Sequence, residues 1–158
     1  MTASQRFPIR VRPYTSADRE FVFHLAPRLL IGMASWRDAT KMLTTVHKWL
    51  TDGIEQHGNQ TMVFIAENEQ GKQLGFASVS HSTHFTGEKQ AYIGELVVDE
   101  TVEASGVGSA LINACEEWAV SHGYKHLVLE TGAANTRARG FYQHLGFLEE
   151  DVKLVKQL

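Results

Sequence analysis

The stretch that most constrains the fold lies between Ala91 and Leu111. An apolar, β-branched run, Leu96-Val97-Val98, ends at acidic turn residues and is soon followed by a glycine pair, Gly106 and Gly108, that opens an amphipathic pattern. This order predicts a strand, a turn and the N-terminus of a long helix. The first N–H groups of a helix have no intrahelical partner, and together with the helix dipole they attract anions. The stretch therefore predicts a ligand that carries phosphate.

Two other phosphate-binding motifs share part of this pattern. A Walker loop requires a Lys after its last glycine, and neither glycine of the pair is followed by one, so nucleoside triphosphate binding of that type is excluded. A Rossmann-type dinucleotide-binding domain stays open as a distant alternative, because Glu130 ends the next predicted strand, where a ribose-binding acid would lie. Its third glycine position is held by Leu111, however, and no βαβ repeat precedes the loop.

A second motif follows the predicted helix. The stretch from Asn135 to Phe147 reads Asn-x-x-Ala-x-x-Phe-Tyr-x-x-x-Gly-Phe, a pattern typical of a short helix that runs into a last hairpin. In their order and spacing, the strand, the glycine loop and this motif resemble the GNAT family, the Gcn5-related acyl-coenzyme A N-acyltransferases. The resemblance implies one α/β (α+β) domain over residues 1–158. It also implies a mixed, mostly antiparallel sheet of six to seven strands with helices on both faces, splayed between strands 4 and 5 to admit the pantetheine arm.

Hydrophobic spacing and turn residues predict the remaining elements. They are a strand from Phe7 to Tyr14, a helix that begins at 15–18 and ends or kinks near Pro27, a helix from Ser35 or Asp38 to about His57, a hairpin of 61–66 and 74–80, and a short strand 127–129 parallel to the central one.

Composition and charge restrict the cellular location and the partners to be expected. The chain is 43% hydrophobic and 21% charged, which is ordinary for a soluble globular protein, and its net charge of −3 without a basic run argues against a nucleic-acid partner. No apolar stretch approaches the roughly 18 residues of a membrane span, and the N-terminus lacks the apolar core of a signal peptide. The single Cys115 excludes an internal disulfide. We therefore expect a cytoplasmic protein without a membrane partner; a homodimer stays open.

The resemblance implies acetyl-coenzyme A as cosubstrate and assigns its contacts. Backbone groups of Leu96 and Val98 would pair with the pantetheine amides like an extra strand, and an adjacent N–H would polarise the acetyl carbonyl. Asn135 would hydrogen-bond the pantetheine arm, although it could also simply cap a helix. The expected cofactor contacts are Leu96, Val97, Val98, Glu103, Ser105, Gly106, Val107, Gly108, Ser109, Ala110, Asn135, Arg137 and Tyr142.

Glu103 departs from the family pattern. The pyrophosphate loop of the family usually has Gln or Arg at this position. A carboxylate has no donor to offer a pyrophosphate and repels it, so we expect Glu103 to weaken coenzyme A binding. This residue keeps a second hypothesis open, a non-catalytic acyl-coenzyme A-binding module that uses the cofactor as a signal.

Amine acylation needs a neutral amine, a polarised thioester carbonyl and a proton for the departing thiolate. Glu95 is the candidate base, since it lies mid-strand between Ile93 and Val97, in apolar company that raises the pKa of a carboxyl group. The alternatives are a structural carboxylate paired with Arg or Lys, or one that orients the acceptor's ammonium. For Tyr142, the resemblance implies the role of proton donor to the thiolate; the alternative is a core aromatic residue with a satisfied hydroxyl.

The acceptor site is expected at the junction of the two N-terminal helices, where the resemblance places one of its walls. Met33, Trp36 and Arg37 would line it together with Glu95. His81 and His84 could line the same pocket or form a solvated hairpin end. Their spacing puts them on opposite faces of a strand, so no metal site is expected. The acceptor is a primary amine, either of a small molecule or of a protein.

Overall fold

The computed structural model describes residues 7–158 and contains one sheet with the strand order β1-β2-β3-β4-β5. The first four strands are antiparallel neighbours, and β5 runs parallel to β4. This mixed, mostly antiparallel sheet confirms the predicted fold class. The strands are β1 (Arg10–Pro13), β2 (Thr61–Glu67), β3 (Gln73–Thr83), β4 (Lys89–Val98) and β5 (Leu127–Leu129).

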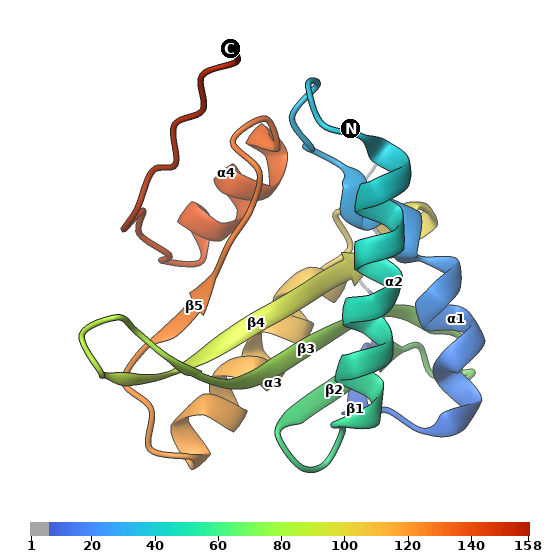
Figure 1. Ribbon diagram of the computed structural model, residues 1–158. Coiled ribbons are helices and arrows are strands. Elements are labelled where there is room, and N and C mark those ends of the chain that lie inside the picture. Colours follow the sequence, from blue (N-terminus) through green and yellow to red (C-terminus); the bar gives the residue numbers. More distant parts are fainter. Residues whose placement is uncertain (1–6) are drawn as a thin grey trace.

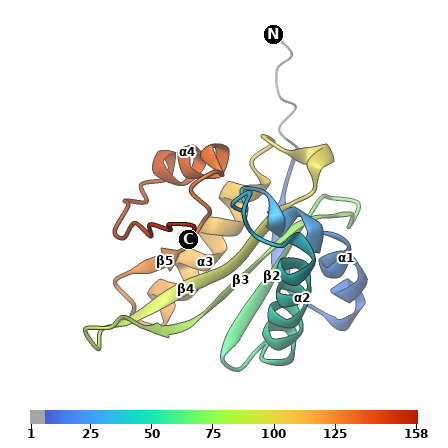
Figure 2. The same ribbon diagram turned by 45° about the horizontal axis from the view of Figure 1, so that its top comes forward.

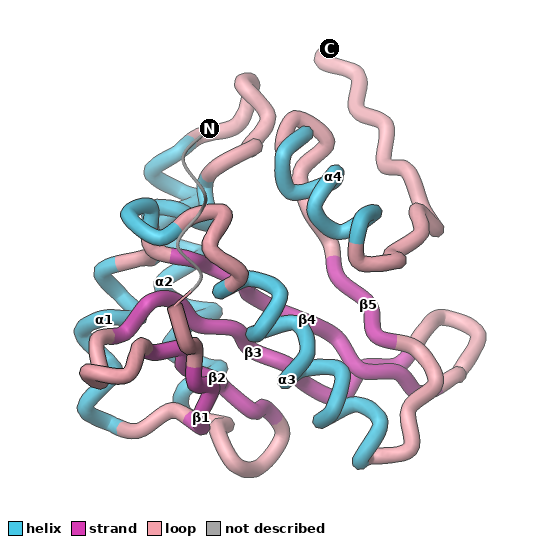
Figure 3. Tube along the Cα trace, turned by 180° about the vertical axis from the view of Figure 1, so that it is seen from behind, coloured by secondary structure: helices cyan, strands magenta, loops and turns pink. Residues whose placement is uncertain are grey.

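Helices cover both faces of the sheet, as predicted (Figure 1). Helices α1 (Arg19–His24) and α2 (Ala39–Glu55) lie on one face, where Val46 and Leu50 of α2 pack against Phe76 of β3. Helix α3 (Val107–Ser121) covers the other face, as the view from behind shows (Figure 3). Helix α4 (Thr136–His144) follows β5. Three short 3₁₀ helices complete the set: η1 (Ser16–Asp18), η2 (Ala26–Leu30), which contains Pro27, and η3 (Glu100–Val102).

The last hairpin that the sequence predicted does not form, so the described sheet has five strands and not six or seven. Residues 148–158 adopt no helix or strand, and Leu148, Val152 and Leu154 are exposed there. Three consecutive acidic residues, 149–151, interrupt this segment, and no Asn-Gly or Asp-Gly pair is present to make a tight turn. The tail runs away from the sheet past α4 (Figure 1).

The expectation that the chain has no signal peptide concerns residues 1–6. These residues lie outside the described part of the chain. Within residues 7–158, no helix is long and apolar enough to cross a lipid bilayer. In the same range, no group of three or more His, Cys, Asp and Glu side chains is arranged to hold a metal ion.

Candidate functional site

Strand β4 changes its pairing at a bulge. Its residues Ala91–Ile93 pair with β5, and no described strand pairs with that edge of β4 beyond them. On the other edge, Ile93 pairs with Val79 of β3 and Glu95 pairs with Ser78, which leaves Gly94 as the extra residue. From Glu95 to Val98, β4 is therefore bonded to β3 alone. The predicted splay between strands 4 and 5 is confirmed, and Figure 2 shows β5 leading away from β4 toward α4.

The open edge of β4 carries backbone groups that point into the gap. The N–H of Asp99 donates to the carbonyl of Leu74 on β3, at 2.8 Å. Because successive residues of a strand turn their backbone groups to opposite sides, Leu96 and Val98 turn theirs away from β3. The carbonyl of Val98 accepts a hydrogen bond from Nε of Arg28, at 2.8 Å. The two residues that the sequence singled out for strand-like pairing thus present their backbone to the gap.

The same bulge corrects the predicted surroundings of Glu95. The sequence placed Ile93, Glu95 and Val97 on one face of the strand. Instead, Ile93 packs in the core beneath α3, whereas Val97 packs in the core beneath α1 and α2. The prediction is wrong because one extra residue shifts the alternation of side chains by one position. Glu95 lies two residues from Val97 and shares its face.

Glu95 is a buried carboxylate whose partner is a hydroxyl. Only 9% of the residue is exposed, its carboxylate accepts a hydrogen bond from the Ser78 hydroxyl, and its own N–H donates to Ser78 Oγ at 3.1 Å. Among the described residues no Arg or Lys pairs with it, so the alternative of a cation-paired carboxylate is not supported. Burial raises the pKa of Glu95, as predicted, and the Ser78 hydrogen bond offsets part of that rise.

Gly94 keeps Ser78 in this place. A Cβ atom on Gly94 would lie 2.9 Å from Ser78 Oγ, too close for the hydroxyl to stay where it is. The glycine thus permits the contact between the β3 hydroxyl and the β4 carboxylate. A side chain at this position would displace the hydrogen-bond donor of Glu95.

The N-terminus of α3 carries backbone N–H groups that are free to bind a ligand. Gly106 precedes the helix with a φ of +94°, which favours glycine, and its carbonyl accepts the first helical hydrogen bond from Ala110, at 3.0 Å. The N–H groups of Val107, Gly108 and Ser109 have no backbone partner among the described residues. Gly108 has a packing role as well, because a Cβ there would lie 3.0 Å from Cζ of Phe141 on α4. The Ser105 hydroxyl donates to the carbonyl of Val102.

Glu103, which the sequence predicts to weaken coenzyme A binding, is ion-paired in the structure. One oxygen of Glu103 accepts from Arg28 of η2, and the other accepts from Arg137 of α4. Arg137, and then Arg28, hold the pKa of Glu103 below its usual value. Three segments that are distant in the sequence thus meet at the mouth of the gap between β4 and β5. The two arginines and Glu103 together carry one positive charge, which is offset by Glu100, 3.6 Å from Arg28.

Tyr142 lies on α4 with its ring held by neighbouring aromatic residues. The ring centroid is 5.3 Å from that of Phe141 and 5.6 Å from that of Phe147. Burial, followed by the nearby Cys115, whose thiol is negative only when ionised, raises the pKa of Tyr142 to about 12. The phenol therefore stays protonated at neutral pH. Tyr142 is partly buried, and its hydroxyl is not among the buried polar atoms that lack a hydrogen-bond partner, of which the described residues contain none.

Comparison with known proteins settles the family. The model of the acetyltransferase (GNAT) family matches residues 20–147, a span that includes β4, the loop, α3 and α4. The chain belongs to the GNAT acetyltransferase family. The alternative of a dinucleotide-binding domain is therefore wrong, because a Rossmann sheet needs parallel βαβ units and strands β1 to β4 of this GNAT domain are antiparallel.

Relatives agree with the assignment. An uncharacterised N-acetyltransferase, YhfO, of Bacillus subtilis (strain 168) is 32% identical over 103 residues, 65% of this chain and 66% of that protein. The matched segments span 37–49% of the other curated relatives. A putative acetyl transferase from Pyrococcus furiosus shares the fold, with a TM-score of 0.76 and 22% identity over 96% of this chain and 100% of that one. So does AAC(6')-Iy in complex with the bisubstrate analog CoA-S-monomethyl-acetylneamine, with a TM-score of 0.68 and 21% identity over 96% and 99% of the two chains.

The GNAT domain brings the expected acceptor wall next to α4. Gly32, before Met33 in the loop between η2 and α2, has a φ of +83°, and a Cβ on it would lie 2.3 Å from Cβ of Asn135. Asn135 caps α4 by accepting from the N–H of Ala138 at 3.3 Å, and its amide donates to the Ile31 carbonyl at 3.4 Å. In this structure Asn135 therefore caps α4 and ties it to the loop. Trp36 and Arg37 are exposed in the same loop.

His81 and His84 lie elsewhere. They belong to the β3–β4 hairpin, at the opposite end of the sheet from the loop between η2 and α2 (Figure 1). His81 stacks near Trp118, with ring centroids 4.9 Å apart, and its Nδ1 hydrogen-bonds the hydroxyl of Tyr124. His84 Nδ1 hydrogen-bonds Thr86 Oγ1 at 2.8 Å. The structure does not bring these histidines to the other predicted acceptor residues.

Three residues of the site were missed from the sequence. Arg28 and Ser78 carried no local signal, because each acts through a partner far along the chain. Gly94 did carry one, since an isolated glycine inside a strand pattern predicts a bulge. Reading that glycine as a bulge would have placed Glu95 on the correct face.

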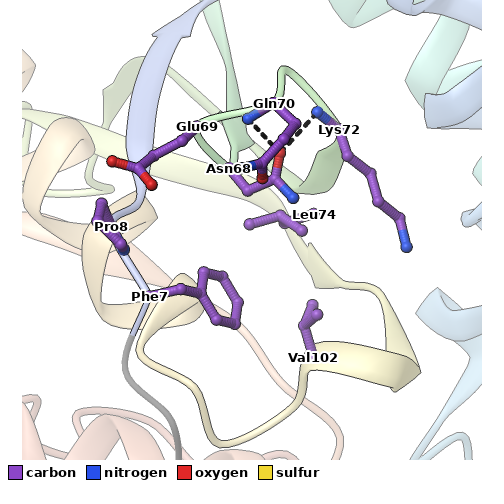
Figure 4. A pocket seen from close by; sticks show the side chains of 8 residues that line it. All are labelled: Phe7, Pro8, Asn68, Glu69, Gln70, Lys72, Leu74 and Val102. Carbon is purple, nitrogen blue, oxygen red and sulfur yellow. Dashed lines mark hydrogen bonds between the residues drawn. The ribbon is translucent and has the colours of Figure 1, made fainter.

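A separate cavity of about 270 Å³ lies away from the splayed strands. Figure 4 shows it between Phe7, Val102 and the turn from β2 to β3, where Asn68 Oδ1 accepts from the N–H groups of Gln70 and Lys72. None of the predicted site residues lines this cavity.

Proposed function

We propose that this chain is an acyl-coenzyme A-dependent N-acyltransferase that moves an acetyl group from acetyl-coenzyme A to a primary amine by direct attack in a ternary complex. The observation that carries the proposal is the open half of β4, which has Glu95 at one end and the N-terminus of α3 beyond the other. Family membership supports the reaction class. The residues present also fit the cosubstrate, because the open edge leaves the Leu96 backbone groups and the Val98 N–H without a strand partner, and the N–H groups at the start of α3 and two arginines lie near the gap.

The residues of the chain would divide the work along the gap. The backbone of Leu96 and Val98 would bind the pantetheine arm as an added strand, and N–H groups from Gly106 to Ala110 would bind the diphosphate. Acetyl-coenzyme A would supply the acyl group as a thioester, which the amine takes with loss of the thiol. An N–H of the open edge would donate to the carbonyl oxygen on which negative charge develops.

Two protons leave the ammonium nitrogen of the acceptor and one joins the departing sulfur. A lysine-like amine is almost fully protonated at pH 7, so a base must accept a proton before or during attack. Glu95 would accept it, directly or through water, since its raised pKa brings its basicity closer to neutral pH. When the new C–N bond forms and the C–S bond breaks, Tyr142 would donate its phenolic proton to the departing sulfur, and the second proton of the nitrogen would pass, directly or through water, to the phenolate and restore it. The phenol is available as a donor because it is protonated at neutral pH.

The acceptor is a primary amine on a small molecule or on a protein. One structural neighbour is a complex with an acetylneamine bisubstrate analog, which makes an aminoglycoside one class to include in a screen. The exposed Trp36 and Arg37 beside the gap would meet the acceptor first. The rival hypothesis of a non-catalytic binding module rests on Glu103, which departs from the family pattern and here lies between two arginines.

The test has two arms on one purified protein. In the first, coenzyme A at ~100-fold above its dissociation constant should raise the melting temperature by roughly 5–10 °C, whereas NAD and ATP should not. In the second, acetyl-coenzyme A is incubated with a panel of amino acids, polyamines, aminoglycosides and peptides, and free thiol is measured. Thiol release that depends on an amine supports the proposal. Coenzyme A binding without transfer to any amine would favour the binding module, and no binding at all would overturn both.

A further inference from the structure

The mouth of the gap between β4 and β5 is bridged by side chains from three segments. Arg28 comes from η2, Glu103 follows η3, and Arg137 lies in the first turn of α4. Each carboxylate oxygen of Glu103 accepts from a different arginine. The bridge links the segment that carries the acceptor loop to the helix that carries Tyr142. It stands three residues before Gly106, at the approach to α3.

The two arginines are held to different degrees. Arg28 has two hydrogen-bond acceptors and a second ion-pair neighbour: its Nε donates to the Val98 carbonyl at 2.8 Å, its Nη2 donates to Glu103, and its Nη1 lies 3.6 Å from Glu100. Its side chain is 22% exposed. Among the described residues, Arg137 is ion-paired with Glu103 alone, and its side chain is 69% exposed. Arg28 is therefore fixed in place, whereas Arg137 can turn to another anion.

We propose that Glu103 is a positioning residue: it holds Arg137 beside the fixed Arg28 at the mouth of the gap, and an incoming diphosphate takes Arg137 over from it. This inference rests on the proposed function, because it takes the diphosphate of coenzyme A as the ligand. A guanidinium forms stronger hydrogen bonds with a doubly charged diphosphate than with one partly exposed carboxylate. The exchange costs little, since Arg137 leaves one anion for another and is already ordered near its new partner.

A positioning role for Glu103 and a simple repulsion by Glu103 predict opposite effects on coenzyme A affinity when the carboxylate is removed. If Glu103 only repelled phosphate, Glu103→Gln would tighten coenzyme A binding. If it positions Arg137, the same change frees a mobile guanidinium, and binding should weaken by roughly three- to tenfold. Arg137→Gln should weaken binding to a similar extent. In the Arg137→Gln background, Glu103→Gln should cause no further loss, because the residue that it positions is gone.

A double-mutant cycle measured by calorimetry at low salt tests the proposal. Coenzyme A is titrated into the wild type, the two single variants and the double variant, and pantetheine, which has no diphosphate, is titrated alongside. The loss should be confined to coenzyme A, whereas a merely structural defect would weaken both ligands. Glu149→Gln is the matched control: it breaks the corresponding exposed ion pair of Arg139 on α4 with the same change in charge, and it should leave affinity unchanged.

Three results would overturn the inference while the proposed function stands. They are tighter coenzyme A binding by Glu103→Gln, an equal loss from Glu103→Gln with and without Arg137, and an equal loss of affinity for pantetheine. A wild type that does not bind coenzyme A overturns the proposed function itself. The two failures are thereby distinguished within one set of titrations.

Discussion

From Ala91 to Ile93, β4 is paired with a strand on each side, whereas from Glu95 to Val98 it is paired with β3 alone. The two halves are continuous and equally well packed, and one extra residue, Gly94, separates them. The paired half contributes to the core beneath α3. The open half turns backbone donors and acceptors into a gap bordered by α4. An exposed strand edge is usually a liability that proteins cover, and here it is the natural place for an extended ligand to pair.

The largest effect should come from Tyr142, the proposed proton donor. Tyr142→Phe keeps the ring that packs on Phe141 and Phe147 but removes the hydroxyl. Turnover on a verified acceptor should fall by about 10²–10⁴-fold, with coenzyme A affinity unchanged. Steady-state and pre-steady-state rates check this together, because slow product release could hide the chemical step. If the variant has the same steady-state and pre-steady-state rates as the wild type, Tyr142 is a packing residue and not the proton donor.

A smaller loss of activity is expected from a change at Glu95, the first residue of the open half. Glu95→Gln should lower kcat/KM by about 10²-fold, the lower end of the range for a general base. The loss is limited because water at the open edge can accept the proton in place of Glu95, although less efficiently. In the wild type, the rate should fall as the pH drops through the raised pKa of Glu95, since only the ionised carboxylate is a base. The variant should lose this limb of the pH profile. A variant that keeps it would show that another group titrates.

One proline substitution in each half of β4 compares the paired half with the open half directly. The Ala91 N–H donates to the His126 carbonyl at 3.0 Å, so Ala91→Pro should destabilise the fold by about 1–3 kcal/mol. The Leu96 N–H faces the gap, where a strand tolerates proline, so Leu96→Pro should fold and instead weaken coenzyme A binding by roughly two- to tenfold. Leu96→Ala is the control for the lost side chain. Equal stability losses in the two proline variants would show that both halves are paired alike.

The smallest effect is on the pH dependence of the stability of the fold. The pKa of Glu95 is raised in the folded state, so its stabilising contribution is fully present below the unfolded pKa and is lost as the pH rises through the folded one. Glu95→Gln should therefore raise the melting temperature at pH 8, by about 2–4 °C for each kcal/mol, and give no gain at pH 4. A gain that is equal at both pH values would mean that the carboxylate is not buried in its charged form.

The parts of the site that the sequence predicted are those with local causes. A glycine before a helix and an Asn at the start of α4 act within a few residues, so their spacing is visible in the chain. Arg28 and Glu103 lie 75 residues apart, and no periodic pattern records such a contact. The face of Glu95 was mispredicted because a single bulge residue reverses every side chain that follows it. The last hairpin was expected from the pattern of residues 135–147, which ends before the acidic tail that would have to form it.

The most direct test of the account is amide hydrogen exchange followed by NMR, with and without coenzyme A. In the free protein, the amides of Leu96 and Val98 should exchange faster than that of Ala91, which is hydrogen-bonded to His126. Saturating coenzyme A should slow exchange at Leu96 and Val98 by at least ~10-fold beyond any general stabilisation, and leave Ala91 changed only by the latter. If these two amides gain no specific protection while coenzyme A binds, the ligand does not pair with the open half of β4, and the site lies elsewhere.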